Sequence, residues 1–169
     1  MQTTTPSLGA AFAQVAWVVP DIQLSEKFFR EVLGVREFVK LENIRSEENE
    51  GRYYGQPDSY VFHLYLAWSG GSMIELIQPV SGKSIFREYL DEHPEGGVQH
   101  IAYTVPESEL NNAINDLTSK GYPVMQSLNL PVAHVAFFDT CKDIGVVTEV
   151  IGLTEEGVQF LEQLKKGAG

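Results

Sequence analysis

Two glutamates occupy positions where a carboxylate is costly. Glu75 and Glu149 lie within short runs, residues 74–77 and 148–151, whose other members are Ile, Leu, Val and Thr. A glutamate buried in such a run needs a partner, because an unpaired charge loses its hydration there. Coordination of a metal ion supplies that partner in proteins, and a buried carboxylate can also serve as an acid or base. We therefore predict that both glutamates are functional.

An internal repeat adds two further polar positions. Residues 14–21 align without a gap with residues 100–107, at an offset of 86 positions, and the two segments share Ala, Val and Pro. The alignment places Gln14 opposite His100. Repeats of this kind indicate a duplicated structural unit, in which equivalent residues recur at equivalent places.

The two glutamates are equivalent as well. Glu75 aligns with Glu149 at an offset of 74, so the first half contains 12 extra residues. A pseudo-twofold axis between the halves would bring both first strands and both last strands around one cleft. We therefore expect Gln14, Glu75, His100 and Glu149 to meet there.

Such a set offers one imidazole nitrogen and three oxygens but no thiolate. It suits one divalent metal of borderline or harder character, Zn, Ni, Co or Mn, with Fe(II) the weaker candidate. Positions left for water or substrate would make the site catalytic. Taken singly, Gln14 could be an ordinary hydrogen-bonded strand residue and His100 a core histidine. The other histidines, His63, His93 and His134, are interpreted as structural or surface residues.

Each half shows the same order of predicted elements, which must position these side chains. A first strand ends at Pro20 or Pro106, a helical pattern follows, and Gly34 or Gly121 ends the helix. Three further β-like runs follow in each half: 35–41, 60–68 and 73–78, then 122–125, 132–138 and 146–151. The pattern predicts an α+β fold of two tandem βαβββ modules.

The remaining segments are assigned as connections. The extra residues fall in the polar stretch 42–59, which is expected to be an extended loop or a lid. We predict a single domain spanning 1–169: module one at 12–80, a linker helix at 81–97, module two at 98–152 and a C-terminal helix at 153–166. That last helix is expected to pack on a sheet.

Composition excludes several classes of partner. The chain has 169 residues, and 12 Lys and Arg against 23 Asp and Glu give a formal net charge of −11. A protein with this charge repels a phosphate backbone, so nucleic acid is not expected as a partner. The single cysteine, Cys141, cannot form an intramolecular disulfide, and the apolar run at residues 10–20 is too short to cross a membrane. We expect a cytoplasmic protein with no membrane partner.

The residues resemble the vicinal oxygen chelate superfamily, which includes glyoxalase I, methylmalonyl-CoA epimerase, extradiol dioxygenases and bleomycin-binding proteins. The likeness covers residues 12–152. The segments most similar to the methylmalonyl-CoA epimerase branch are 74–79, 84–86, 96–102, 135–138 and 145–149. The resemblance implies a curved sheet, or half-barrel, around a central metal cleft. It also implies a homodimer with a complete site in each chain, acting on a small-molecule substrate.

The family's four metal ligands fall on Gln14, Glu75, His100 and Glu149. Epimerases of the similar branch commonly have His at the first position, whereas the Gln/Glu/His/Glu set is similar to eukaryotic-type glyoxalase I. The glutathione-contacting features of that enzyme are missing, however. Val18 stands where it has Arg, and Pro79 stands where it has Asn.

The likeness implies proton transfer next to a carbonyl, with Glu149 as the catalytic base and Glu75 as its catalytic partner on the opposite face. The expected function is therefore that of a metal-dependent isomerase, epimerase or lyase acting on a small metabolite or thioester. A coenzyme A thioester is the first candidate, although the acidic chain has no basic patch for its phosphates. The alternatives are a non-catalytic binding protein of the bleomycin-resistance type and an extradiol-type dioxygenase.

Overall fold

The computed structural model describes residues 12–167. The first half contains β1 (Phe12–Val18), α1 (Ile22–Glu31), β2 (Val39–Arg45), the 3-10 helix η1 (Ser46–Asn49), β3 (Arg52–Tyr53), β4 (Gln56–Pro57), β5 (Val61–Ser69) and β6 (Ser72–Ser81). After α2 (Ile85–Glu92), the second half contains β7 (Gly97–Pro106), η2 (Glu107–Glu109), α3 (Leu110–Ser119), β8 (Val124–Asn129), β9 (Ala133–Phe138), α4 (Cys141–Ile144) and β10 (Val147–Leu153). The chain then forms α5 (Glu155–Gly167).

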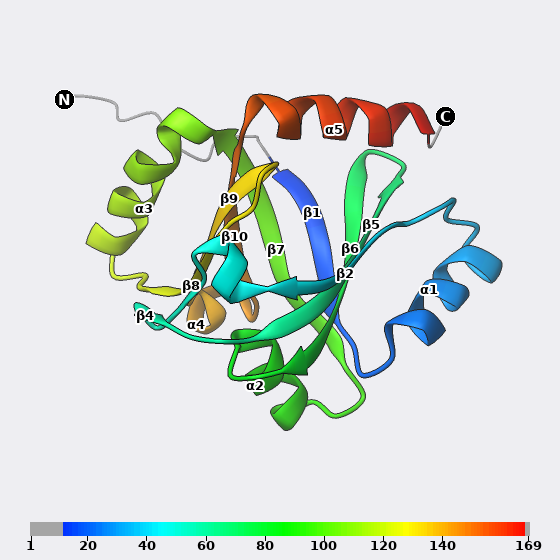
Figure 1. Ribbon diagram of the computed structural model, residues 1–169, viewed down its shortest axis with the longest axis horizontal. Helices are drawn as coiled ribbons and strands as arrows, with labels where there is room; N and C mark the ends of the chain where they lie inside the picture. The colour runs from blue at the N-terminus through cyan, green and yellow to red at the C-terminus, as the bar shows by residue number, and fades with distance from the viewer. Residues whose placement is uncertain (1–11, 168–169) are drawn as a thin grey trace.

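All the strands join one mixed sheet in the order β2-β5-β6-β1-β7-β10-β9-β8-β3-β4. The next four strands have the equivalent order in reverse, so that β1 corresponds to β7, β6 to β10, β5 to β9 and β2 to β8 across the middle of the sheet. The sheet curls into a half-barrel, with α1 and α3 outside it (Figure 1). The predicted α+β fold of two βαβββ units around a curved sheet is confirmed.

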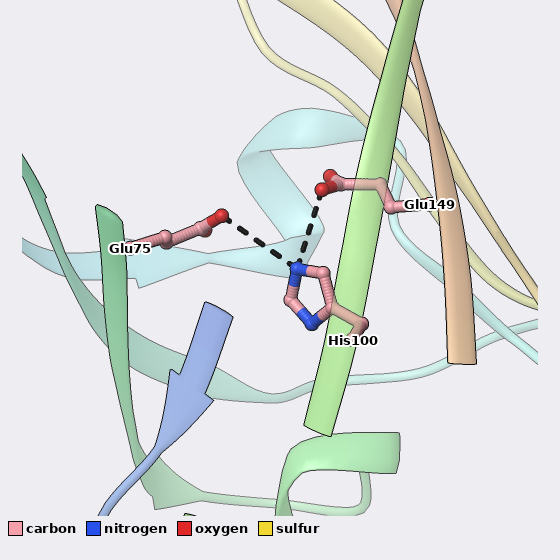
Figure 2. Close-up of side chains that lie close together, drawn as sticks. All are labelled: Glu75, His100 and Glu149. Carbon is pink, nitrogen blue, oxygen red and sulfur yellow. Dashed lines mark ion pairs between the residues drawn. The ribbon is translucent and has the colours of Figure 1, made fainter. Parts of the chain in front are cut away.

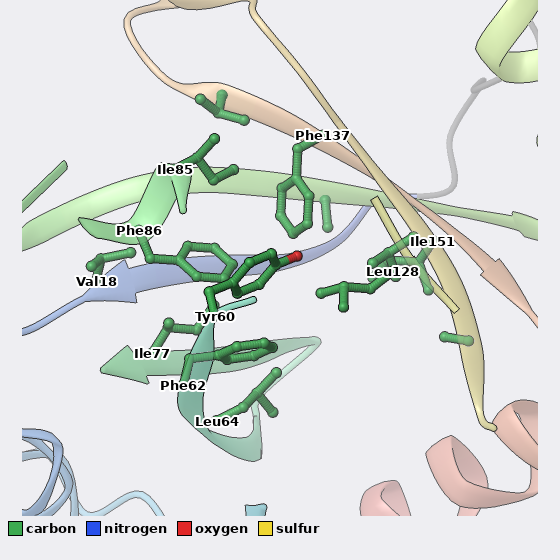
Figure 3. Packing of buried hydrophobic residues seen from close by; sticks show 14 of the residues in the cluster. Val18, Tyr60, Phe62, Leu64, Ile77, Ile85, Phe86, Leu128, Phe137 and Ile151 are labelled. Carbon is green, nitrogen blue, oxygen red and sulfur yellow. The ribbon is translucent and has the colours of Figure 1, made fainter. Parts of the chain in front are cut away.

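The two faces of the sheet bury different clusters. On the outer face, α1 covers a cluster built around Leu76, and α3 covers a second one around Val150. The inner face holds the largest cluster, in which the rings of Phe62, Phe86 and Phe137 contact one another in sequence (Figure 3).

The polar stretch that contains the 12 extra residues of the first half is partly built into the sheet. Residues 42–45 continue β2, and the segment 46–59, here called the clasp, carries η1, β3 and β4. Within it, Arg52 and Tyr53 pair with Ser127 and Gln126 of β8, at the opposite end of the sheet from β2. The prediction of an extended loop over 42–59 is therefore wrong for most of its length. Its polar composition reflects exposure to water at a sheet edge and not a lack of structure.

The clasp is held by a buried serine. Ser46 is fully buried, and its hydroxyl donates to the Asp58 carbonyl at 2.7 Å and accepts from the Tyr60 amide at 2.8 Å. Gly51 passes so close that a Cβ there would lie 2.4 Å from Ser46 Cβ.

Among the described helices, none is long and apolar enough to cross a membrane.

We expect Gly51→Ala to loosen the clasp, because the added methyl group must displace Ser46. The free energy of unfolding should fall by about 1–3 kcal/mol, the usual cost of overpacking. The matched control is Gly71→Ala, whose Cβ would meet no atom within 4 Å. Thermal denaturation of both variants checks this, and equal melting temperatures would contradict the role given to Ser46.

Candidate metal centre

Register across β6, β1 and β7 brings the first two predicted ligands together. Glu75 on β6 lies beside Ala16 on β1, and Ala16 lies beside His100 on β7. Residues in register point to the same side of a sheet, so Glu75 and His100 face each other across the small side chain of Ala16.

A second row repeats this pattern one strand further on. Gln14 on β1 lies beside Ala102 on β7, and Ala102 lies beside Glu149 on β10. Ala102 is the repeat equivalent of Ala16, and both are completely buried. The shared alanine of the two repeats is thus the residue that keeps the space between the polar side chains clear.

The four predicted ligands converge on the inner face of the sheet, and all are buried: Gln14 is 2% exposed, Glu75 4%, His100 0% and Glu149 4%. One ligand atom from each of the two glutamates and the histidine lies within 4.8 Å of the other two. Figure 2 shows both carboxylates directed at the same imidazole nitrogen. The four positions that the repeat predicted to meet do so.

The imidazole of His100 directs its Nε2 atom at both glutamates. Its Nε2 lies 3.3 Å from Glu149 Oε2 and 3.6 Å from Glu75 Oε2, yet it forms no hydrogen bond. The ring rests edge-on against Phe137, with ring centres 5.1 Å apart. A buried nitrogen without a hydrogen bond, facing two carboxylates, fits a divalent metal that would bind all three groups.

Gln14 completes the set from the neighbouring strand. Its amide nitrogen donates to Glu75 Oε2 and, at 2.9 Å, to Glu149 Oε2. A half-turn of the terminal amide exchanges its nitrogen and oxygen with little change in shape, which would direct a ligand oxygen to the same point. The side chain can therefore either bridge the two carboxylates or join them as a ligand.

One residue of the site was missed by sequence reasoning. In β7, Ala16 pairs with His100 while Trp17 pairs with Val98, so Gln99 is an extra, unpaired residue, a β-bulge. The bulge allows Gln99 Oε1 to approach His100 Nδ1 at 2.5 Å.

This contact orients the ligand. A carbonyl oxygen requires a hydrogen on Nδ1, and the neutral imidazole then carries its free electron pair on Nε2, the atom that faces both glutamates. The available signal was two consecutive polar residues inside an apolar strand. Ala13, the repeat equivalent of Gln99, is also an unpaired bulge residue but has no polar group to offer.

Charge is strongly coupled within the cluster. Burial alone would lower the pKa of His100, but the nearby carboxylates of Glu149 and Glu75 raise it to about 9. Burial raises the pKa of Glu149; the His100 and Gln14 contacts oppose this increase, while the charge of Glu75 adds to it. A proton on His100 and a divalent metal thus compete for the same two carboxylates.

The other histidines lie away from this centre, as predicted. His63 Nδ1 accepts the Asn43 amide at 3.0 Å, and His93 stacks on Tyr89. His134 Nδ1 lies 3.2 Å from Glu107. Each has a local structural partner, and none faces the four ligands.

The centre opens into a cavity of about 310 Å³. Gln14, Glu75 and Glu149 form its polar floor, and the remaining lining residues are apolar. A few polar groups at the base of an apolar cavity are the arrangement typical of a small-molecule site.

We expect Ala102→Val to weaken metal binding at least tenfold, because two added methyl groups would enter the space between Gln14 and Glu149. The control is Ala136→Val, an equally buried alanine packed in the outer cluster under α3. Both substitutions should lower stability by about 1–3 kcal/mol through overpacking. Zinc affinity measured by competition with a chelating dye separates them, and equal affinities would contradict the position assigned to Ala102.

We also expect the stability of chelator-treated protein to fall between pH 6.5 and 9. The folded state keeps a proton on His100 that the unfolded chain releases near pH 6.5, and the raised pKa of Glu149 acts in the same direction. The loss should be on the order of 1–3 kcal/mol. Urea denaturation across this range measures it. His100→Gln should flatten the profile and His63→Gln should not; a profile unchanged in His100→Gln would contradict the coupling.

Comparison with solved structures agrees with the fold. Methylmalonyl-CoA epimerase from Mycobacterium tuberculosis is similar with a TM-score of 0.62 at 17% identity, covering 94% of this chain and 97% of its own. A methylmalonyl-CoA epimerase in complex with methylmalonyl-CoA has a TM-score of 0.59 at 21% identity, over 86% and 95%. A hypothetical protein from Bacillus halodurans has a TM-score of 0.58 at 22% identity, over 85% and 94%. At these identities the likeness shows the fold.

Comparison with curated protein sequences gives no match. A family model, in contrast, matches residues 13–138, which include the first strand of each half and three of the four converging side chains. The match extends over most of the chain, and it agrees with the family resemblance inferred from the sequence. The chain belongs to the glyoxalase/bleomycin resistance protein/dioxygenase superfamily.

Proposed function

We propose that this protein is a metal-dependent isomerase, epimerase or lyase that moves a proton on the carbon next to a carbonyl group. The observation that supports it is the convergence of two buried carboxylates on an imidazole nitrogen that has no hydrogen bond. Gln14, Glu75, His100 and Glu149 are the proposed ligands of one divalent metal per chain, with Zn, Ni, Co and Mn the candidates. The resemblance to the vicinal oxygen chelate superfamily, which implies a central metal cleft, supports this assignment.

A divalent metal bound here would act as a Lewis acid on a substrate oxygen and stabilise the negative charge that appears when the adjacent carbon loses a proton. The protein must then supply the base. Glu149 is the proposed base; because the charge of the metal lowers the basicity of a bound carboxylate, Glu149 would accept the proton after leaving the metal on substrate binding.

Glu75 is the proposed second proton carrier. It comes from β6 and Glu149 from β10, so the two carboxylates approach the centre from opposite sides of the β1-β7 pair. A carbon held between them could lose a proton to one and regain it from the other on its opposite face. That exchange is what an epimerase requires, and an isomerase or glyoxalase needs the same two groups.

The chemistry of the substrate is less constrained than the reaction. Among the similar solved structures are methylmalonyl-CoA epimerases, which makes a coenzyme A thioester a candidate. The Gln/Glu/His/Glu set keeps a glyoxalase-type substrate as the other candidate. We further propose a homodimer with a complete site in each chain.

One observation favours a second function, that of a non-catalytic small-molecule binding protein. The Gln14 amide nitrogen contacts both carboxylates, so the chain can partner Glu75 and Glu149 with a donor of its own. A protein of this kind would keep the apolar cavity and use the polar floor only to bind the ligand. Its properties would not depend on added metal.

Metal content tests the proposal directly. Elemental mass spectrometry of protein purified without an affinity tag should give about one equivalent of Ni, Co, Zn or Mn. His100→Ala should lose it, and His134→Ala, which changes a histidine outside the centre, should retain it. Protein that neither contains nor takes up metal would overturn the enzyme proposal in favour of the binding protein, and bound iron would favour the dioxygenase alternative.

Proton transfer is tested with the same preparation in D₂O. We expect metal-loaded protein to incorporate deuterium at the acidic carbon of methylmalonyl-CoA, or of the methylglyoxal–glutathione adduct, as read by NMR. Glu149→Gln should slow this exchange by about 100-fold or more, the usual contribution of a general base, while retaining most of the metal. Exchange unaffected by Glu149→Gln would contradict its role as the base.

A further inference from the structure

The C-terminal helix α5 forms a wall of the cavity above the metal centre. Gly157, Phe160 and Leu161 line this cavity together with residues from β2, β5, β6, β9 and β10. Figure 1 shows α5 lying across one end of the curled sheet, over the strands of both halves. Packing on the sheet, expected from its apolar residues, is thus only part of what this helix does.

The first turn of α5 is attached to the β8–β9 turn. The Thr154 hydroxyl donates to the Val132 carbonyl at 3.0 Å and accepts the Gly157 amide at 3.1 Å. A Cβ at Gly157 would lie 2.0 Å from the Val132 carbonyl oxygen, so only glycine permits this approach. Near the other end, Lys165 Nζ lies 4.8 Å from the centre of the Trp68 ring. The middle turn, with Phe160 and Leu161, is therefore held over the cavity.

The lining of the cavity is mostly apolar and carries no positive charge. Apart from the ligands Gln14, Glu75 and Glu149, the residues around it are apolar, and none of those described is Lys or Arg. A phosphate or carboxylate in its upper part would have no positive partner and would lose its hydration, which is unfavourable. A hydrocarbon group there would be stabilised by burial against Leu64, Leu66 and Leu161.

The volume limits the size of the ligand. An apolar cavity of roughly 150 Å³ is large enough to hold a benzene ring. At about 310 Å³ this cavity accommodates an oxygen-bearing group at the polar floor and a hydrocarbon group on the order of one ring or a short alkyl chain.

We propose that α5 selects the substrate, and that this substrate places an oxygen-bearing group at the metal and an uncharged hydrocarbon group beneath Phe160 and Leu161. The proposal rests on the proposed function, because the metal centre supplies the site for the oxygens. It names the part of the substrate that does not react, and it makes Phe160 and Leu161 specificity-determining residues. The lining offers no positive partner to the phosphates of a coenzyme A thioester, so these groups would lie outside the cavity.

Alkyl hydroxamates test the proposal, because they keep one pair of metal-binding oxygens while the hydrocarbon chain varies. Binding of acetohydroxamate, butanohydroxamate and hexanohydroxamate to zinc-loaded protein is measured by calorimetry. Affinity should rise by about two- to fourfold for each added methylene, as expected for burial of a CH₂ group.

Variants of α5 show whether the helix is responsible. Leu161→Trp should reduce the affinity for hexanohydroxamate at least tenfold and leave acetohydroxamate within about twofold, whereas Leu161→Ala should flatten the dependence on chain length. Val158→Ala is the matched control, since Val158 is about half exposed on the same helix and does not line the cavity. Circular dichroism and zinc content verify that each variant is folded and loaded.

The outcomes separate this inference from the proposed function. If zinc binds and acetohydroxamate binds, but affinity is independent of chain length or of Leu161, the inference on α5 fails while the metal centre stands. If no hydroxamate binding depends on zinc while longer chains still bind more tightly, the cavity is as described and the metal-dependent function fails.

Discussion

Two carboxylates buried at the middle of a continuous sheet are the constraint on which the rest of the structure depends. Water cannot solvate Glu75 or Glu149 there, so the protein must bring a donor or a cation to them. Strand register does this, by setting Gln14 and His100 in the two rows that the glutamates occupy. A slip of one residue in any of the four central strands would turn a polar side chain to the outer face.

The pseudo-twofold arrangement is close but not complete, and the departures lie where chemistry differs between the halves. Both halves place an alanine between the polar side chains and a bulge just before the first ligand. Only the second half has a polar bulge residue, Gln99, and only there is the following ligand an imidazole whose tautomer must be fixed. The first half follows its bulge with an amide, which has no tautomer to choose. The two repeats thus share their strand pairing, and differences at equivalent positions, such as Gln99 and Ala13, make the two sides of the centre different.

Much of the site could be predicted because its residues occupy equivalent positions in the two repeats. Gln14 would be unremarkable alone, but its equivalence to His100 and the apolar neighbours of both glutamates predict the four-residue cluster that the structure brings together. Gln99 was missed because a bulge depends on pairing between strands far apart in sequence. The cavity role of Phe160 was missed for a similar reason, since its helical pattern reports a buried face without saying what lies beneath it. The strands of the clasp could not be predicted, because two-residue edge strands are polar and too short to show an alternating hydrophobic pattern.

The path of the clasp also governs how the chain can be assembled. Residues 52 and 53 of the first half pair with residues 127 and 126 of the second, which lie more than seventy residues later in the sequence. The first half alone would also leave β1 without β7, exposing a long edge that invites pairing with other chains. Contacts of such sequence separation slow folding. The two halves are therefore structurally interdependent, because the sheet is complete only when strands of both are paired.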